Sequence, residues 1–178
     1  PDHTYVPLRM VFAVKHDGRR KARLVAGGHV TDPVNEEIYS SVVAPKGIRI
    51  VTFLADMNSL DLLTGDVGNA YLNAKTREKI WVKFGIKFGE KLAGKIGIMV
   101  KSLYGLKTSC ARWSEHLADN LRDMGWVESK AENDVWMKDC DTHYEYLAVY
   151  SDDIIIASKN PQTIMDEIKS RYNMKGVG

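Results

Sequence analysis

Residues 144–158 read YEYLAVYSDDIIIAS, and this stretch decides the fold. Two runs rich in apolar residues flank the pair Ser151-Asp152, which is the point at which the chain can turn. The second run, 153–157, is apolar on both faces after its first residue, a pattern typical of a strand buried on both sides. The stretch therefore predicts a buried antiparallel hairpin with Asp152 and Asp153 at its tip.

Further strands and helices are predicted on both sides of this hairpin. Apolar residues at helical spacing predict three helices, over 46–60, 112–125 and 161–174, the last with Asn160 as its cap. Runs rich in β-branched residues predict strands at 10–14, 23–26, 79–84, 98–103 and 135–137. Asp17-Gly18 would join the first two strands as a hairpin. This order indicates an α+β fold, a sheet with helices packed on one side.

Composition and charge exclude several classes of protein. The 178 residues are 44% hydrophobic and 27% charged, as expected for a globular domain and not for a disordered chain. The net charge of +2 is too balanced for a surface that binds polyanions all over. Residues 9–23, however, hold six Lys or Arg against Asp17 alone, which indicates either a solvated hairpin tip or an edge that contacts phosphate. No apolar run approaches the roughly 18 residues of a membrane span, and no secretory signal opens the chain.

The cysteines and histidines are not expected to bind a metal. Cys110 and Cys140 lie thirty residues apart without a Cys-x-x-Cys or Cys/His pattern, which argues against a disulfide framework and against a structural zinc site. We therefore expect reduced thiols and an intracellular protein. The histidines are scattered without ligand spacing and are interpreted as structural or surface residues: His3, His16, His29, His116 and His143.

Acidic residues occur at two places where they are costly. Asp66 follows an apolar approach, and Asp152-Asp153 lies at the tip of the apolar hairpin. Carboxylates gathered at the end of a buried sheet repel one another and lose hydration, so a cation is needed to neutralise them. Oxygen ligands without His or Cys favour Mg²⁺, and two such ions are typical of phosphoryl or nucleotidyl transfer. The alternative is that each Asp only bonds the backbone of its own turn.

Four short motifs, in order along the chain, resemble one family. Residues 150–153, YSDD, look like the Tyr-x-Asp-Asp box of reverse transcriptases, and 66–73, DVGNAYLN, are similar to the first catalytic-Asp motif of these enzymes. Residues 21–26, KARLVA, and 101–107, KSLYGLK, resemble the copia-type LTR-retrotransposon polymerase in particular. The resemblance implies a right-hand polymerase fold with an antiparallel palm sheet backed by helices. It would divide the chain into mainly fingers over about 1–60 and mainly palm, with some fingers, over about 61–178, without thumb or RNase H.

The resemblance also implies a site. Asp66, Asp152 and Asp153 would be the catalytic carboxylates; Asp66, Asp152 and the Val67 carbonyl would bind two Mg²⁺ ions, for which Mn²⁺ can substitute. Other residues would contact the nucleotide: Lys21 and Arg23 its triphosphate, Tyr71 its sugar as a gate against ribonucleotides, and Gly105 by close backbone approach.

The implied activity is RNA-directed DNA polymerase, weak or absent in these residues alone. The implied partners are dNTPs, an RNA or DNA template with a DNA primer, the thumb and RNase H parts of a longer polyprotein, and a second copy if the protein dimerises. No membrane is implied, and the implied location is intracellular: the cytoplasm, in virus-like particles, and the nucleus.

Three departures from the family pattern keep a second interpretation open. Gly27 stands where the family often has Arg, Thr108-Ser109-Cys110 replaces Gln, a small residue and Pro, and Ser151 replaces an apolar residue. They motivate the alternative of a catalytically silent module with the same fold that binds nucleic acid or serves in assembly. A different two-metal phosphotransferase is disfavoured by the match at Tyr71.

Overall fold

The computed structural model describes residues 2–31 and 38–178. The chain forms two compact units, and each is built from two separate segments. Unit 1 comprises residues 1–39 and 71–113, and unit 2 comprises residues 40–70 and 114–178. The boundary expected near residue 60 falls inside unit 2, between a helix and the strand that carries Asp66.

Unit 1 contains two small sheets. The hairpin of β2 (Leu8–Val14) and β3 (Arg20–Ala26) confirms the turn predicted at Asp17-Gly18. The second sheet has the order β1 (Thr4–Tyr5), β5 (Ile80–Lys83) and β6 (Ile96–Ile98). Short 3-10 turns occupy Gly28–Val30, Ala70–Asn73 and Ile86–Phe88. The core of the unit consists of Val6, Ala26, Ile80, Val82, Leu103 and Leu106.

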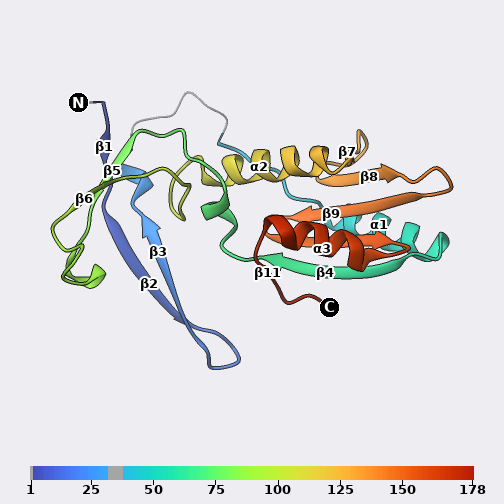
Figure 1. The fold of residues 1–178 in the computed structure, drawn as a ribbon, viewed down its shortest axis with the longest axis horizontal. Coiled ribbons are helices and arrows are strands. Elements are labelled where there is room, and N and C mark those ends of the chain that lie inside the picture. The colour runs from blue at the N-terminus through green and yellow to red at the C-terminus, as the bar shows by residue number, and fades with distance from the viewer. Residues whose placement is uncertain (1, 32–37) are drawn as a thin grey trace. The chain divides into compact units, whose positions relative to one another are not determined.

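Unit 2 is built on a six-stranded antiparallel sheet with the order β11-β4-β10-β9-β8-β7 (Figure 1). The predicted hairpin lies in its middle, as β9 (Tyr144–Tyr150) and β10 (Asp153–Ser158). Ile154 and Ile156 of β10 are fully buried, as the apolar run predicts. The remaining strands are β4 (Asp61–Val67), β7 (Val127–Glu128), β8 (Val135–Asp139) and β11 (Met174–Lys175).

Helices cover both faces of this sheet, so the expectation of helices on one side is wrong. Helix α1 (Pro45–Met57) packs on the face that carries Ile155 and Ala157 of β10. Gly65 pairs with Ile154 on the other face, and a Cβ on Gly65 would lie 3.0 Å from the Met165 side chain of α3 (Pro161–Arg171). Because neighbouring strand residues point to opposite faces, α1 and α3 lie on opposite sides, as Figure 1 also shows.

Helix α2 (Ser109–Asp123) belongs mostly to unit 2 and lies on the side of α3. The Arg171 guanidinium donates to the Asn120 side-chain oxygen at 2.9 Å, and the Arg122 guanidinium lies 5.5 Å from the centre of the Trp136 ring. Leu117 and Leu121 are almost fully buried, which confirms the predicted amphipathic helix.

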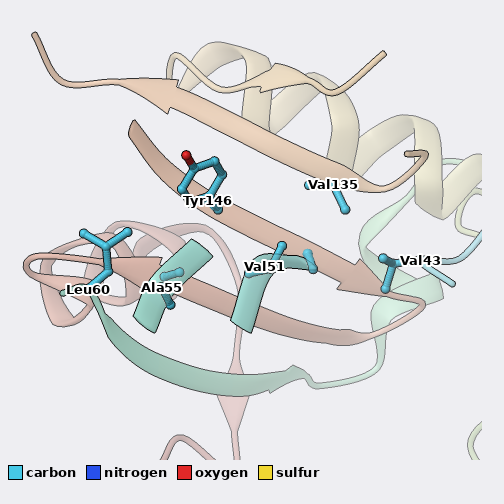
Figure 2. Close-up of a cluster of buried hydrophobic side chains, with 8 residues drawn as sticks. Val43, Val51, Ala55, Leu60, Val135 and Tyr146 are labelled. Atoms are coloured by element: carbon cyan, nitrogen blue, oxygen red, sulfur yellow. The ribbon is translucent and has the colours of Figure 1, made fainter. Parts of the chain in front are cut away.

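The core on the α1 face is a continuous apolar cluster (Figure 2). Its buried members are Val43, Val51, Ala55, Leu60, Val135, Tyr146, Ala148 and Ala157. Figure 2 shows Val51 and Ala55 of α1 on the side of the helix that faces the strands bearing Tyr146 and Val135. This packing fixes the sheet that carries the acidic hairpin tip.

Three predicted elements end earlier than expected, and one of them is the helix predicted over 46–60, which ends at Met57. The strand predicted over 98–103 is largely wrong, because β6 ends at Ile98 and the residues beyond it form only single backbone contacts, such as the Lys75–Lys101 bridge. The helix expected to reach residue 174 ends at Arg171, where Tyr172 turns to an extended conformation. Met174 then joins β11 and pairs with Val67. The Asn160 cap is confirmed, since its side chain accepts from the Thr163 N–H.

Within the described residues, no helix has the length and apolar character required to cross a bilayer.

Candidate active site

The structure brings the two acidic motifs of unit 2 together. Asp153, the first residue of β10, lies directly opposite Asp66 of β4 in the antiparallel ladder. The Val67 N–H donates to the Asp152 carbonyl at 2.7 Å, which ties the hairpin turn to the end of β4. Side chains opposite one another on antiparallel strands share a face, with Cβ atoms about 5 Å apart. Asp66 and Asp153 therefore face each other across 87 positions of sequence.

The turn itself is built for this approach. Ser151 has φ 59°, the left-handed conformation, and Asp152 completes the two-residue turn. Ser is small and polar and tolerates this geometry better than the branched apolar residues that would suit a strand. The backbone turn therefore places two consecutive carboxyl groups where the central strands of the sheet end.

The electrostatics of the site reflect the crowding of like charges. Burial raises the pKa of Asp153 above its ordinary value, and the negative charges of Asp152 and Asp66 raise this pKa further. A bound cation would relieve this cost, and the donor set of carboxylate oxygens suits Mg²⁺. The three aspartates do not bring one oxygen each within 4.8 Å of one another. Among the described residues, the set of possible metal ligands that meets this distance is Cys140, His143 and Glu145.

Lys175 is a neighbour of this site that sequence reasoning missed. It lies opposite Asp66 on β11, so Asp66 has Asp153 on one side and Lys175 on the other. A Cβ on Gly68 would lie 3.1 Å from the Lys175 Nζ, so the ammonium group lies over this glycine. The sequence does not indicate this neighbour, because the pattern of residues 161–174 predicts one helix and no strand after it.

In unit 1, two of the residues expected to contact the nucleotide, Arg23 and Tyr71, lie against the ring of Tyr104. The Arg23 guanidinium lies 5.3 Å from the centre of the Tyr104 ring, and the Tyr104 ring lies 4.7 Å from the ring of Tyr71. The Tyr71 hydroxyl and the Cys110 Sγ are 3.1 Å apart, with either atom as the donor. Tyr71 is therefore held at both its ring and its hydroxyl.

Lys21 and Gly105 complete the expected set. Lys21 lies two residues before Arg23 on β3, and the two side chains therefore share a face of the hairpin. Gly105 has φ 91°, and a Cβ at this position would lie 2.1 Å from the Ala26 carbonyl oxygen. The close approach of β3 is therefore enough to require glycine here, and the sequence did not reveal this contact.

The structure accommodates the departures from the family pattern. Thr108 is fully buried, and its hydroxyl donates to a Glu78 carboxylate oxygen at 2.6 Å, so it replaces the expected Gln with a satisfied contact. A Cβ on Gly27 would lie 2.9 Å from Pro7 Cγ, which makes this position too tight for Arg unless Pro7 moves.

Comparison with known proteins identifies the family. The whole chain, residues 1–178, matches the family described as reverse transcriptase (RNA-dependent DNA polymerase). It is 30% identical over 98% of its length to the retrovirus-related Pol polyprotein from transposon RE1 of Arabidopsis thaliana, and 29% identical over 98% to that from transposon RE2. It is 29% identical over 93% of its length to the transposon Ty1-BL Gag-Pol polyprotein of Saccharomyces cerevisiae.

These relatives are much longer polypeptides. The chain spans 13% of the RE1 and RE2 polyproteins and 9% of the Ty1-BL polyprotein. The matched region includes both acidic motifs and the hairpin with the basic residues. The chain therefore belongs to the reverse transcriptase (RNA-dependent DNA polymerase) family, and within it to the copia type.

Proposed function

We propose that this chain is the polymerase core of a copia-like retrotransposon, which adds deoxynucleotides to a primer 3′-hydroxyl on an RNA or DNA template. The observation that carries the proposal is the ladder position of Asp153 opposite Asp66, with Asp152 bonded to Val67 at the same end of the sheet. Family membership supports the same activity. Unit 2 would be mainly the palm, and the hairpin of unit 1 would belong to the fingers.

The acidic residues would divide the work. Asp66, Asp152 and the Val67 carbonyl would hold two Mg²⁺ ions, or Mn²⁺ in their place, and Asp153 would support them from the edge of the group. When bound, such ions lower the pKa of the attacking hydroxyl and offset the charge on the leaving pyrophosphate. The sheet contributes rigidity, because Asp66 and Asp153 are fixed by the ladder on both sides of β4.

Residues of unit 1 would bind the nucleotide. Lys21 and Arg23 would contact the triphosphate, where charge-assisted hydrogen bonds are strong. The ring of Tyr71 would exclude a 2′-hydroxyl from the sugar site, and its packing on Tyr104 would keep that ring from yielding. Gly105 would bring its backbone close to the nucleotide. The Arg23–Tyr104 contact would keep the guanidinium extended in front of the ring.

The chain would work as part of a longer Pol polypeptide. Its relatives are longer Pol polyproteins, and we expect a primer–template duplex to contact more protein surface than these residues provide. Thumb and RNase H regions, and a second copy if the enzyme dimerises, would supply that surface. The proposed location is the cytoplasm, inside virus-like particles, with access to the nucleus.

The test is Mg²⁺-dependent extension of an oligo(dT) primer on poly(rA), with these residues extended through the thumb of the longer Pol polypeptide. Asp152→Asn keeps the shape of the side chain but removes its charge, so it should reduce extension by at least a hundredfold. The matched control is Asp56→Asn, an exposed carboxylate on α1 of the same unit, which should extend as the wild type does. Equal extension by wild type and Asp152→Asn would refute the catalytic role.

The same protein also distinguishes the polymerase from the alternative, a catalytically silent module. Gly27 and Thr108 motivate it, although both are accommodated by their neighbours. Such a module would bind an RNA–DNA duplex with a steep dependence on salt and show no turnover with either metal. Duplex binding without extension by the wild type would favour it.

A further inference from the structure

We propose that Cys140, His143 and Glu145 form a zinc-binding site at the hairpin that joins β8 and β9. One ligand atom from each of the three residues lies within 4.8 Å of the others. All three side chains are partly buried. The spacing Cys-x-x-His-x-Glu places the three ligands in six consecutive residues of one turn.

The backbone of the turn holds these ligands in place. The Cys140 N–H donates to the His143 carbonyl at 2.9 Å, which closes the loop. Glu145 lies opposite Lys138 in the β8–β9 ladder, one residue into β9. Asp141 has φ 61°, and this left-handed residue lets the chain reverse between Cys140 and His143. A site formed by a closed hairpin loses little further chain entropy when it binds an ion.

One polar atom of the cluster, the Nε2 of His143, has a partner still to be supplied. The Nδ1 of His143 lies 3.1 Å from the Thr142 hydroxyl, which leaves Nε2 for another partner. The Nε2 is buried and has no hydrogen-bond partner among the described residues; the nearest acidic oxygen, on Glu145, is 3.8 Å away. A buried polar atom without a partner is costly, and a metal ion would satisfy it.

A second layer of contacts supports the ligands. The Ser158 hydroxyl, fully buried on β10, donates to the Glu145 carboxylate. Thr142 fixes the ring of His143 through its other nitrogen. Partners that orient ligating carboxylates and imidazoles in this way are usual around protein metal sites.

The donor set selects zinc over magnesium. Thiolate and imidazole donors suit Zn²⁺, whereas Mg²⁺ requires oxygen ligands. A thiolate, a carboxylate and a neutral imidazole together carry two negative charges, which balance the ion. In a tetrahedral site with ligands 2.0–2.3 Å from zinc, the ligand atoms lie roughly 3.5 Å apart. The three side chains would therefore close by about 1 Å, and water would take the fourth position.

This site is separate from the acidic turn. Glu145 lies near the start of β9, whereas the Asp152 turn follows the end of the same strand at Tyr150. Five residues of strand span roughly 17 Å. Zinc here would link the β8–β9 turn to β10 through Ser158 and stabilise that edge of the sheet, with no part in nucleotidyl transfer.

The test is metal binding by the purified chain after removal of metal with a chelator. We expect one Zn²⁺ per chain, and Co²⁺ in its place should give a thiolate-to-cobalt charge-transfer band. Cys140→Ser and His143→Gln should each weaken zinc binding at least a hundredfold. Ser158→Ala should weaken it tenfold or more, because it removes the contact that orients Glu145. Asp152→Asn should bind zinc as the wild type does.

The matched control is Cys110→Ser, which removes the other thiol, on a different unit, and should leave the cobalt band unchanged. If Cys140→Ser does not fold, alkylation answers the same question: blocking Cys140 in the Cys110→Ser protein should abolish the band. No saturable zinc binding, or a band that persists without the Cys140 thiol, would show that the cluster is only a hydrogen-bonded turn.

Discussion

Lys175 lies directly opposite Asp66 across the β11–β4 ladder. Since Asp153 occupies the corresponding position on β10, the row reads cation, carboxylate, carboxylate across three strands. We expect the positive charge of Lys175 to offset part of the repulsion between the two aspartates and to compete with a metal ion bound there.

Replacing Lys175 by Met tests this balance, because Met keeps the length of the side chain and removes its charge. We expect Mg²⁺ to bind about fivefold more tightly, taking about 1 kcal/mol, the energy of two unit charges about 4 Å apart in water, as the scale of the lost repulsion. In low salt with a chelator, the variant should be less stable by a similar amount, and 1 M salt should abolish the difference. The control is Lys159→Met, exposed just beyond the opposite end of β10. Unchanged Mg²⁺ affinity in Lys175→Met would contradict the electrostatic role.

Tyr71 gives a prediction about selectivity. Tyr71→Val removes the ring that would clash with a 2′-hydroxyl, so ribonucleotide incorporation relative to deoxynucleotide incorporation should rise about tenfold or more. Single-nucleotide kinetics with each substrate measure this ratio. Tyr71→Phe is the control: it keeps the ring against Tyr104 and removes the hydroxyl that contacts Cys110, so discrimination should remain. A ratio that does not change in Tyr71→Val would remove the gate assignment.

Gly105 gives a prediction about stability. Gly105→Ala imposes a left-handed conformation on alanine and forces its Cβ against the Ala26 carbonyl oxygen, 2.1 Å away. We expect a loss of about 3 kcal/mol or more in the free energy of unfolding. Gly94→Ala has a similar φ, 80°, but nothing within 4 Å of the new Cβ, so it should lose only about 1 kcal/mol. Urea unfolding without nucleotide compares them, and equal losses would show that the overlap is relieved by movement.

The sequence predicted the parts of the fold that depend on local pattern. The apolar runs of residues 144–158 predicted the central hairpin, and Asp17-Gly18 predicted the hairpin that carries the basic residues. Elements that depend on a distant partner were not predictable in this way. Tyr172 continues the helical spacing of Ile164 and Ile168, yet it is extended because Met174 pairs with Val67, more than a hundred residues earlier.

The candidate site shows the same division. Asp66, Asp152 and Asp153 could be predicted from their motifs. The position of Lys175 could not, because it lies on an edge strand of two residues, which is too short to give a sequence pattern. Cys140, His143 and Glu145 have a spacing that metal ligands can have, but so short a pattern does not show that the three side chains converge. The turn that joins them is visible only once β8 and β9 are paired.

Asp134 is a buried carboxylate outside both sites. Its side chain is in a residue that is 8% exposed, its Oδ2 has no hydrogen-bond partner among the described residues, and φ is 58°. Burial raises the pKa of Asp134 above its ordinary value of 3.8, and a hydrogen bond from Ser41 offsets part of this effect. A carboxyl group whose pKa is raised by folding contributes stability below its unfolded pKa and loses that contribution as pH rises through the folded value.

Asp134→Asn removes the charge and keeps a residue type that tolerates the left-handed conformation. The variant should therefore be more stable than the wild type by about 1 kcal/mol at neutral pH, with the gain shrinking toward zero near pH 3.5. Urea unfolding in the presence of a chelator measures both values. Asp141→Asn is the matched control, since Asp141 has φ 61° and is exposed, and its effect should not vary with pH in this way. A gain for Asp134→Asn that is the same at both pH values would mean that the carboxylate is not destabilised by burial, and that water reaches Oδ2 in solution.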